Sequence, residues 1–228
     1  LSPDAGVDVG PPQLPAARSD ESWDVPNLYR LRVAPDRAAQ ARRHGATTET
    51  ESAVWAALQW LADNQEPQGY WNPSRHEGCH ETLVAGQNRR GATMQADTGM
   101  TGLALLAMLA AGQTHRQGQY QDNVRRGLSY LIDIQKPDGS LAGPANAFAA
   151  AYCHAMAAVA LSEAYAMTGD ERLAEPVRRA VGYTVAAQDP QGGGWRYMPG
   201  DAGDTSQLGW QLMVIKSAEY AGIHIPDT

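Results

Sequence analysis

Hydrophobic residues along this chain follow the helical period in six segments of two alternating kinds. In the first kind apolar residues occupy one side of the helix and charged residues the other, near residues 50–64, 119–135 and 172–188. The second kind is apolar or small on nearly every side, near residues 98–111, 146–168 and 204–221. A helix that is apolar all round has to be covered on all sides. We therefore predict an all-α fold, with an inner layer of parallel helices wrapped by an outer layer.

The end of each one-sided helix repeats one design. Counted from Val54, Val124 and Val177, a glutamine follows at offset eleven, a proline at thirteen and a glycine at fifteen, and a large apolar residue follows the glycine two or three positions later. Proline cannot continue a helix, glycine permits a tight turn, and a glutamine amide can bond to free helix carbonyls. The repeated residues are Gln65, Gly69 and Trp71; Gln135, Gly139 and Leu141; and Gln188, Gly192 and Trp195.

Three such turns predict three helical hairpins, with the three valines in equivalent settings. The plainer alternative is a helix-ending turn that is merely used three times. We assign the hairpins to a domain at 48–223, opened by a Thr48–Glu51 capping box. Residues 1–47 are predicted to form an extended arm or linker, with a short helix after Pro35.

Composition narrows the classes of function. The 228 residues carry a formal net charge of -7, which argues against non-specific nucleic-acid binding. Two cysteines are too few for a disulfide framework. The longest charge-free run, 141–162, contains polar residues and suits a buried helix better than a membrane span, so no transmembrane segment is predicted. The chain is expected to be soluble, and the sequence leaves cytoplasmic and extracytoplasmic locations equally open.

The repeated residues resemble the terpenoid-cyclase and protein-prenyltransferase superfamily of α/α toroids. The resemblance rests on Gln65-x3-Gly69-x-Trp71 and on two degenerate copies, and it covers roughly residues 48–223. In squalene and hopene cyclases such glutamine–tryptophan repeats tie outer helices together. The segment from Gly194 to Trp210 is also similar to uncharacterised bacterial squalene-cyclase-like proteins. The resemblance implies a partial toroid of three hairpins, where a complete ring has six, and an apolar groove along the inner helices.

The catalytic motifs of these enzymes are absent from the sequence. The chain has no Asp-x-Asp-Asp run, no Asp-Asp-x-x-Asp run, and no aspartate two residues before a cysteine. A cavity for carbocations also needs stacked aromatic rings, and the chain is only 7% aromatic. We expect an apolar or isoprenoid-like ligand to bind in the groove without autonomous cyclase activity. The alternatives are a structural or protein-interaction scaffold whose open edges meet a second copy or the remainder of a longer polypeptide, and a metal-dependent enzyme.

Candidate site residues come from the inner helices and the loops at their start. His154 lies two turns inside an inner helix, near helix starts that carry Asp97 and Asp204, so these three are the catalytic candidates. The alternative is that the two aspartates are N-caps and His154 is a hydrogen-bonded core residue. The residues expected to line the ligand groove are Tyr152, His154, Asp204, Trp210 and Tyr197.

A second candidate site is the loop segment His76-Glu77-x-x-His80. The spacing matches the zinc-protease pattern. In that pattern the two histidines lie on one helix, whereas this segment lies in a loop and contains Gly78. The candidate metal ligands are His76, Cys79 and His80. No cofactor is predicted, and a metal at this loop stays an open alternative.

Overall fold

The computed structural model describes residues 23–78, 83–84, 86–88, 91 and 93–225, and these residues form an almost entirely helical protein. The predicted all-α class is confirmed. The elements are α1 (Asn27–Val33), α2 (Arg37–Arg43), α3 (Thr48–Asp63), the 3-10 helix η1 (Pro73–His76), β1 (Leu83–Val84), β2 (Gln87–Asn88), α4 (Asp97–Ala110), α5 (Gln121–Ile134), α6 (Ala147–Thr168), α7 (Glu171–Ala186) and α8 (Thr205–Tyr220).

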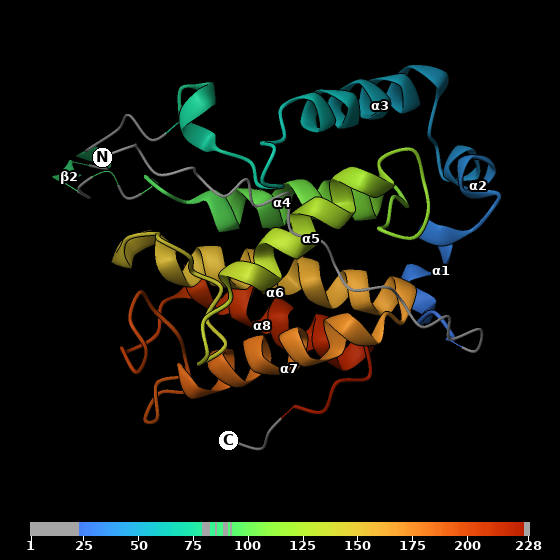
Figure 1. Ribbon diagram of the computed structural model, residues 1–228. Helices are drawn as coiled ribbons and strands as arrows, with labels where there is room; N and C mark the ends of the chain where they lie inside the picture. Colours follow the sequence, from blue (N-terminus) through green and yellow to red (C-terminus); the bar gives the residue numbers. More distant parts are fainter. Residues whose placement is uncertain (1–22, 79–82, 85, 89–90, 92, 226–228) are drawn as a thin grey trace, which may run out of the picture.

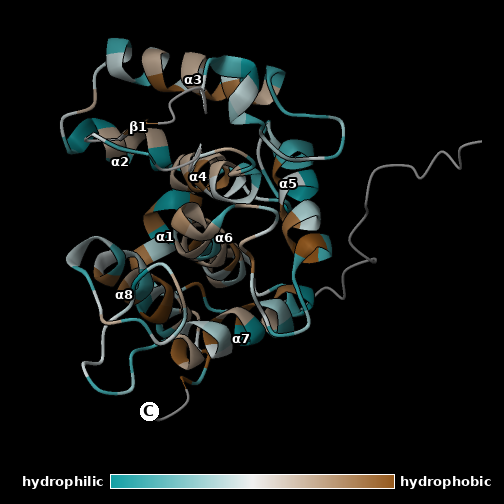
Figure 2. Cartoon of the chain, turned by 90° about the vertical axis from the view of Figure 1, so that its left-hand side faces the viewer, coloured by the Kyte–Doolittle hydropathy of each residue, from teal (hydrophilic) through white to brown (hydrophobic). Residues whose placement is uncertain are grey.

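The helices lie in two layers (Figures 1 and 2). The inner helices α4, α6 and α8 lie side by side, with α6 in the middle. The outer helices α5 and α7 cover the seams on one side and run in the opposite direction. This arrangement is the predicted hairpin architecture, in which the helices that are apolar all round form the inner layer.

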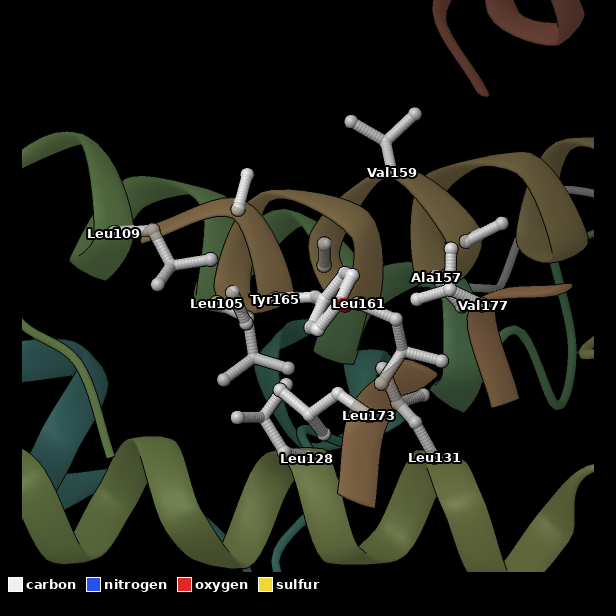
Figure 3. Close-up of a cluster of buried hydrophobic side chains, with 14 of the residues drawn as sticks. Leu105, Leu109, Leu128, Leu131, Ala157, Val159, Leu161, Tyr165, Leu173 and Val177 are labelled. Atoms are coloured by element: carbon white, nitrogen blue, oxygen red, sulfur yellow. The ribbon is translucent and has the colours of Figure 1, made fainter. Parts of the chain in front are cut away.

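Alanine and glycine allow the inner helices to approach closely. A Cβ atom built on Gly102 of α4 would lie 2.6 Å from the backbone of Met156 in α6, so no larger residue fits there. The core then fills the space between the two layers. Figure 3 shows Leu105 of α4, Leu128 and Leu131 of α5, Leu161 of α6 and Leu173 of α7 converging in one cluster, and all five are fully buried.

The repeated turns connect successive hairpins. The Gln65 side-chain amide donates to the Gly69 carbonyl at 2.8 Å and to the Asn123 carbonyl of α5 at 2.9 Å. The Gln135 amide likewise donates to the Gly139 carbonyl at 3.2 Å and to the Pro176 carbonyl of α7 at 2.9 Å. Each glutamine therefore closes its own turn and ties it to the next outer helix.

In two of the turns the tryptophan of the repeat makes an equivalent hydrogen bond. The Trp71 indole donates to the Leu61 carbonyl at 2.8 Å, and the Trp195 indole donates to the Thr184 carbonyl at 2.7 Å. Leu61 and Thr184 stand at the same offset, seven, from Val54 and Val177. The indoles thus satisfy matching carbonyls near the ends of α3 and α7.

The third turn is one residue longer than the sequence pattern indicates. Gly193, with φ +70°, takes the place of Gly69 and Gly139, and the Gln188 amide donates to its carbonyl at 2.6 Å. The assignment of Gly192 to the repeat is therefore wrong by one position. The correction makes the large residue follow the glycine by two positions in all three turns, because Trp71, Leu141 and Trp195 each lie two residues on.

Several other boundaries differ from the prediction. The arm contains an unexpected helix, α1, whose Tyr29 is buried against the core. The capping box is formed by Thr47 and Thr50, one residue earlier than expected. The loop before α4 holds a two-stranded hairpin of four residues, although the sequence shows no strand pattern. These features depend on contacts with distant segments or on side-chain choices that local pattern does not resolve.

The three valines are not equally buried, contrary to expectation. Val124 and Val177 are fully buried, whereas Val54 on α3 is 42% exposed. A preceding turn lies against α5 and another against α7, but no preceding turn among the described residues lies against α3. The difference in burial therefore follows from the position of α3 at the edge of the array.

Helix α6 is the one described helix that is long and apolar enough to cross a membrane, judged by length and composition. Most of its surface is buried against α4, α7 and α8. Such burial is typical of the central helix of a folded domain.

Candidate ligand groove

One stripe of α4 is left uncovered by the rest of the fold. Leu105, Met108 and Leu109 face the core and are fully buried. Met100 and Leu103, on another side of the helix, remain partly or largely accessible. The helix is apolar all round, so this accessible stripe forms the floor of an apolar groove.

The first chamber of the groove lies between α4 and α3. It has a volume of about 540 Å³, which is within the usual size range of small-molecule sites. Its walls come from the end of α3, the first repeated turn and η1. The lining residues are Trp60, Leu61, Trp71, Asn72, Pro73, His76, Gly78, Thr93, Ala96, Met100, Leu103, Ala104 and Ala107.

The second chamber lies between the first turns of α4 and α6 and has a volume of about 340 Å³. Four residues line both chambers: Thr93, Ala96, Met100 and Leu103. The two chambers are therefore adjacent lobes of one groove, separated by Met100 and Leu103. The remaining lining residues of the second chamber are Gly99, Phe148, Ala149, Tyr152, Cys153, Met156 and Tyr197.

Aromatic rings form one wall of the second chamber. Tyr197, from the loop before α8, packs edge-on against Phe148 with ring centroids 5.6 Å apart, and its ring lies 6.4 Å from that of Tyr152. The Arg196 guanidinium lies 5.7 Å from the centre of the Tyr197 ring. Tyr152 and Tyr197, both expected in the groove from sequence, are thus brought together by the packing of α6 against the last loop.

Asp204 lines neither chamber, contrary to expectation, and is connected to the aromatic wall through one serine. The Tyr152 hydroxyl lies 2.6 Å from Ser206 Oγ, which in turn donates to Asp204 Oδ1 at 2.5 Å. Asp204 is also the N-cap of α8 and accepts from the backbone of Ser206 and Gln207. The hydrogen bond from Ser206 holds the pKa of Asp204 below its usual value. A carboxylate held in its ionised form suits a cap better than a general acid.

His154 lies in the core and lines neither chamber. Leu141 N donates to His154 Nδ1 at 3.1 Å, and His154 Nε2 lies 2.9 Å from Thr184 Oγ1. The matching contact in the first hairpin is Trp71 N donating to Thr101 Oγ1 at 3.1 Å. His154 therefore anchors a repeated turn to its inner helix, and the expectation that it faces the groove is wrong.

The other two sequence candidates also lie outside the chambers. Asp97 is in the first turn of α4, where Ala96 is the N-cap and no side-chain cap bond forms, so the capping prediction is wrong. Burial, followed by the nearby Glu66 carboxylate, raises the pKa of Asp97. Trp210 of α8 packs against the core and contributes to neither lining.

Of the proposed metal ligands only His76 belongs to the described residues. It is exposed at the rim of the first chamber, 4.8 Å from the Trp60 ring. Cys79 and His80 lie outside the part of the chain that the structure describes. Within that part, no three His, Cys, Asp or Glu side chains are grouped closely enough to hold a metal ion.

Sequence reasoning misses most of the first chamber. Trp60 falls in the one-sided helix predicted near residues 50–64, and Met100 and Leu103 fall in the fully apolar helix predicted near 98–111. The spacing of these two places them on a common side of α4, but every side of α4 is apolar, so the sequence does not tell which one stays uncovered. The structure assigns the groove to this side because α3 stands away from α4 at the edge of the array.

The fold and the groove define a class: a repeat of α/α hairpins with an accessible apolar inner face. The sequence model of the squalene-hopene cyclase C-terminal domain matches residues 37–152, about half of the chain. The chain belongs to this family, in agreement with the resemblance seen in its repeats. No curated protein and no solved structure matches it.

Proposed function

We propose that this domain binds one elongated apolar molecule, an isoprenoid or a comparable hydrocarbon chain, along the inner-helix groove. The observation that carries the proposal is that the two chambers share lining residues, among them Met100 and Leu103. A bulky compact ligand fits one lobe, whereas a chain passes over this ridge into both. Transfer of such a chain from water to an apolar wall contributes about 0.8 kcal/mol for each buried methylene.

The composition of the walls supports the same class of ligand. Methionine, leucine and alanine supply most of the floor, and aromatic rings stand at both ends: Trp60 and Trp71 in the first lobe, Phe148 and Tyr197 in the second. Methionine adapts to irregular hydrocarbon shapes, and aromatic faces pack well on unsaturated chains.

The proposal is tested by titrating the purified protein with farnesol and, separately, with 1-dodecanol while following tryptophan fluorescence. Both compounds are expected to change the emission of Trp60 and Trp71. Met100→Glu places a charge on the ridge between the lobes and is expected to weaken binding at least tenfold, because the carboxylate is desolvated by the chain.

Leu31→Glu is the matched control, because Leu31 is an exposed apolar residue on α1 that lines neither chamber. It should bind both alcohols as the wild type does. Absence of saturable binding, or equal affinity of the Met100→Glu variant, would refute the proposal. Stronger binding of farnesol than of dodecanol would assign the isoprenoid subclass.

A further inference from the structure

Two junctions inside the chain are built alike. A Cβ atom on Gly69 would collide with the carbonyl oxygen of Arg126 in α5, and one on Gly139 would collide with that of Arg179 in α7. Both arginines stand two residues after the valine of their outer helix. Each turn therefore rests on the backbone of the next outer helix at the same place.

The glutamine of each turn bonds to a second carbonyl of that helix. Gln65 reaches Asn123 and Gln135 reaches Pro176, each one residue before the valine. In the first junction, Tyr70 of the turn also stacks on Tyr130 of α5, with centroids 5.0 Å apart. A receiving helix thus offers carbonyls at offsets minus one and plus two, and α5 also offers an aromatic ring at offset six.

The third turn has the same internal hydrogen bonds as the first two, but no next outer helix among the described residues lies against it. Gly193 N donates to the Asp189 carbonyl at 2.9 Å, and Asp189 N donates to the Gly194 carbonyl at 2.8 Å, as in the other two turns. Only the Gln188 side chain lies within 4 Å of a Cβ atom built on Gly193. A surface hollow of about 620 Å³ opens there, lined by the end of α7 and residues 188–193.

Helix α3 has the receiving positions, but no turn among the described residues covers them. Counted from Val54, the two receiving positions are Ala53 and Ala56, and the aromatic position is Trp60. Ala53 and Ala56 are exposed, Val54 is 42% exposed and Trp60 is 50% exposed. This is the side of an outer helix that a preceding turn covers in α5 and α7.

We propose that the third turn of one copy of this chain docks on α3 of a second copy, with the register of the two internal junctions. The contact continues the established interface between hairpins and joins unlike surfaces of the two partners. Such head-to-tail contacts close into a ring when the rotation per copy permits it.

Three alanine-to-glutamate variants test the proposal by sedimentation velocity between about 1 and 100 µM, a range set by ordinary protein–protein affinities. Ala56→Glu blocks the receiving side of α3, and Ala186→Glu fills the hollow beside the third turn. Ala38→Glu, on exposed α2, is the control. Wild type and control are expected to self-associate, and the two blocked variants are expected to stay monomeric with unchanged thermal midpoints.

Mixing the two blocked variants distinguishes head-to-tail from symmetric contact. Each retains one functional surface, so the mixture is expected to form a one-to-one dimer that neither variant forms alone. A wild-type chain that stays monomeric at about 100 µM would overturn the proposal. So would association of either blocked variant at wild-type strength, or a mixture that remains monomeric.

Discussion

Gly139→Ala is expected to destabilise the protein by about 3–5 kcal/mol, because two penalties act at one position. Gly139 has φ +92°, a region that costs an alanine roughly 1–2 kcal/mol. Its new methyl group would also collide with the Arg179 carbonyl oxygen, so the turn or α7 has to move. That movement breaks the bond from Gln135 to the Pro176 carbonyl, on which the second junction depends.

The matched control is Gly193→Ala in the third turn. Gly193 has a comparable φ of +70°, but a methyl group there meets nothing closer than Gln188 Nε2 at 3.7 Å. Within one chain only the backbone penalty remains, so the expected loss in the monomer is about 1 kcal/mol. Urea denaturation of both variants measures the difference. Equal losses would show that the second turn does not rest on α7.

The free energy of unfolding is expected to fall by about 3 kcal/mol between pH 7 and pH 4 through His154 alone. Burial lowers the pKa of this imidazole from 6.5 to about 4. The unfolded chain therefore takes up a proton as the pH falls below 6.5, whereas the folded chain does not until about pH 4. The unfolded state binds more protons throughout this window, so stability decreases as the pH falls.

The hydrogen bonds of His154 also indicate that the free energy of unfolding decreases as the pH falls. Leu141 N donates to His154 Nδ1, so Nδ1 carries no proton and Nε2 donates to Thr184 Oγ1. Protonation of Nδ1 removes the acceptor for Leu141 and releases the second turn from α6. His154→Gln keeps one acceptor and one donor but does not titrate. Urea midpoints measured from about pH 7 to pH 4.5 should therefore decline less steeply in this variant, and parallel declines would contradict the assignment.

Asp170 contributes in a lower pH range and is separable from His154. Burial alone would raise its pKa, but hydrogen bonds from Arg172 and His115 outweigh burial and hold the pKa below the ordinary value. A carboxylate with a lowered pKa contributes stability above its unfolded pKa of 3.8, and this contribution is lost as the pH falls further. Measurements above about pH 4.5 therefore exclude most of the contribution of Asp170, and the comparison with His154→Gln isolates that of His154.

The three turns illustrate how far the local pattern extends. The spacing of Gln65, Gly69 and Trp71 is set by the turn itself, so its copies are recognisable from the order of residues. The extra residue in the third turn shifts the glycine to Gly193, which the local sequence hides because Gly192, Gly193 and Gly194 are adjacent. The positive φ of Gly193 and the hydrogen bond from Gln188 to its carbonyl identify the equivalent residue.

The site candidates show the opposite case. The sequence places Tyr152 and Tyr197 in the groove, and both line its second chamber. His154 follows Tyr152 by two positions on the same helix, yet it is buried in the core. A helix that is apolar on every side gives no indication of which side faces solvent, so residue type alone does not separate the two.

The order of amino acids is enough to define the six helices of the hairpins, their alternation between one-sided and fully apolar, and the turn that joins successive hairpins. These features depend on interactions between residues close together in the chain, which the period and the turn residues record directly. Packing between distant segments decides which stripe of α4 remains accessible. It also leaves Val54 exposed while it buries Val124, and it places His154 where it holds a turn. Those outcomes depend on which distant surface covers each helix, and the array supplies that cover to α5 and α7 but not to α3.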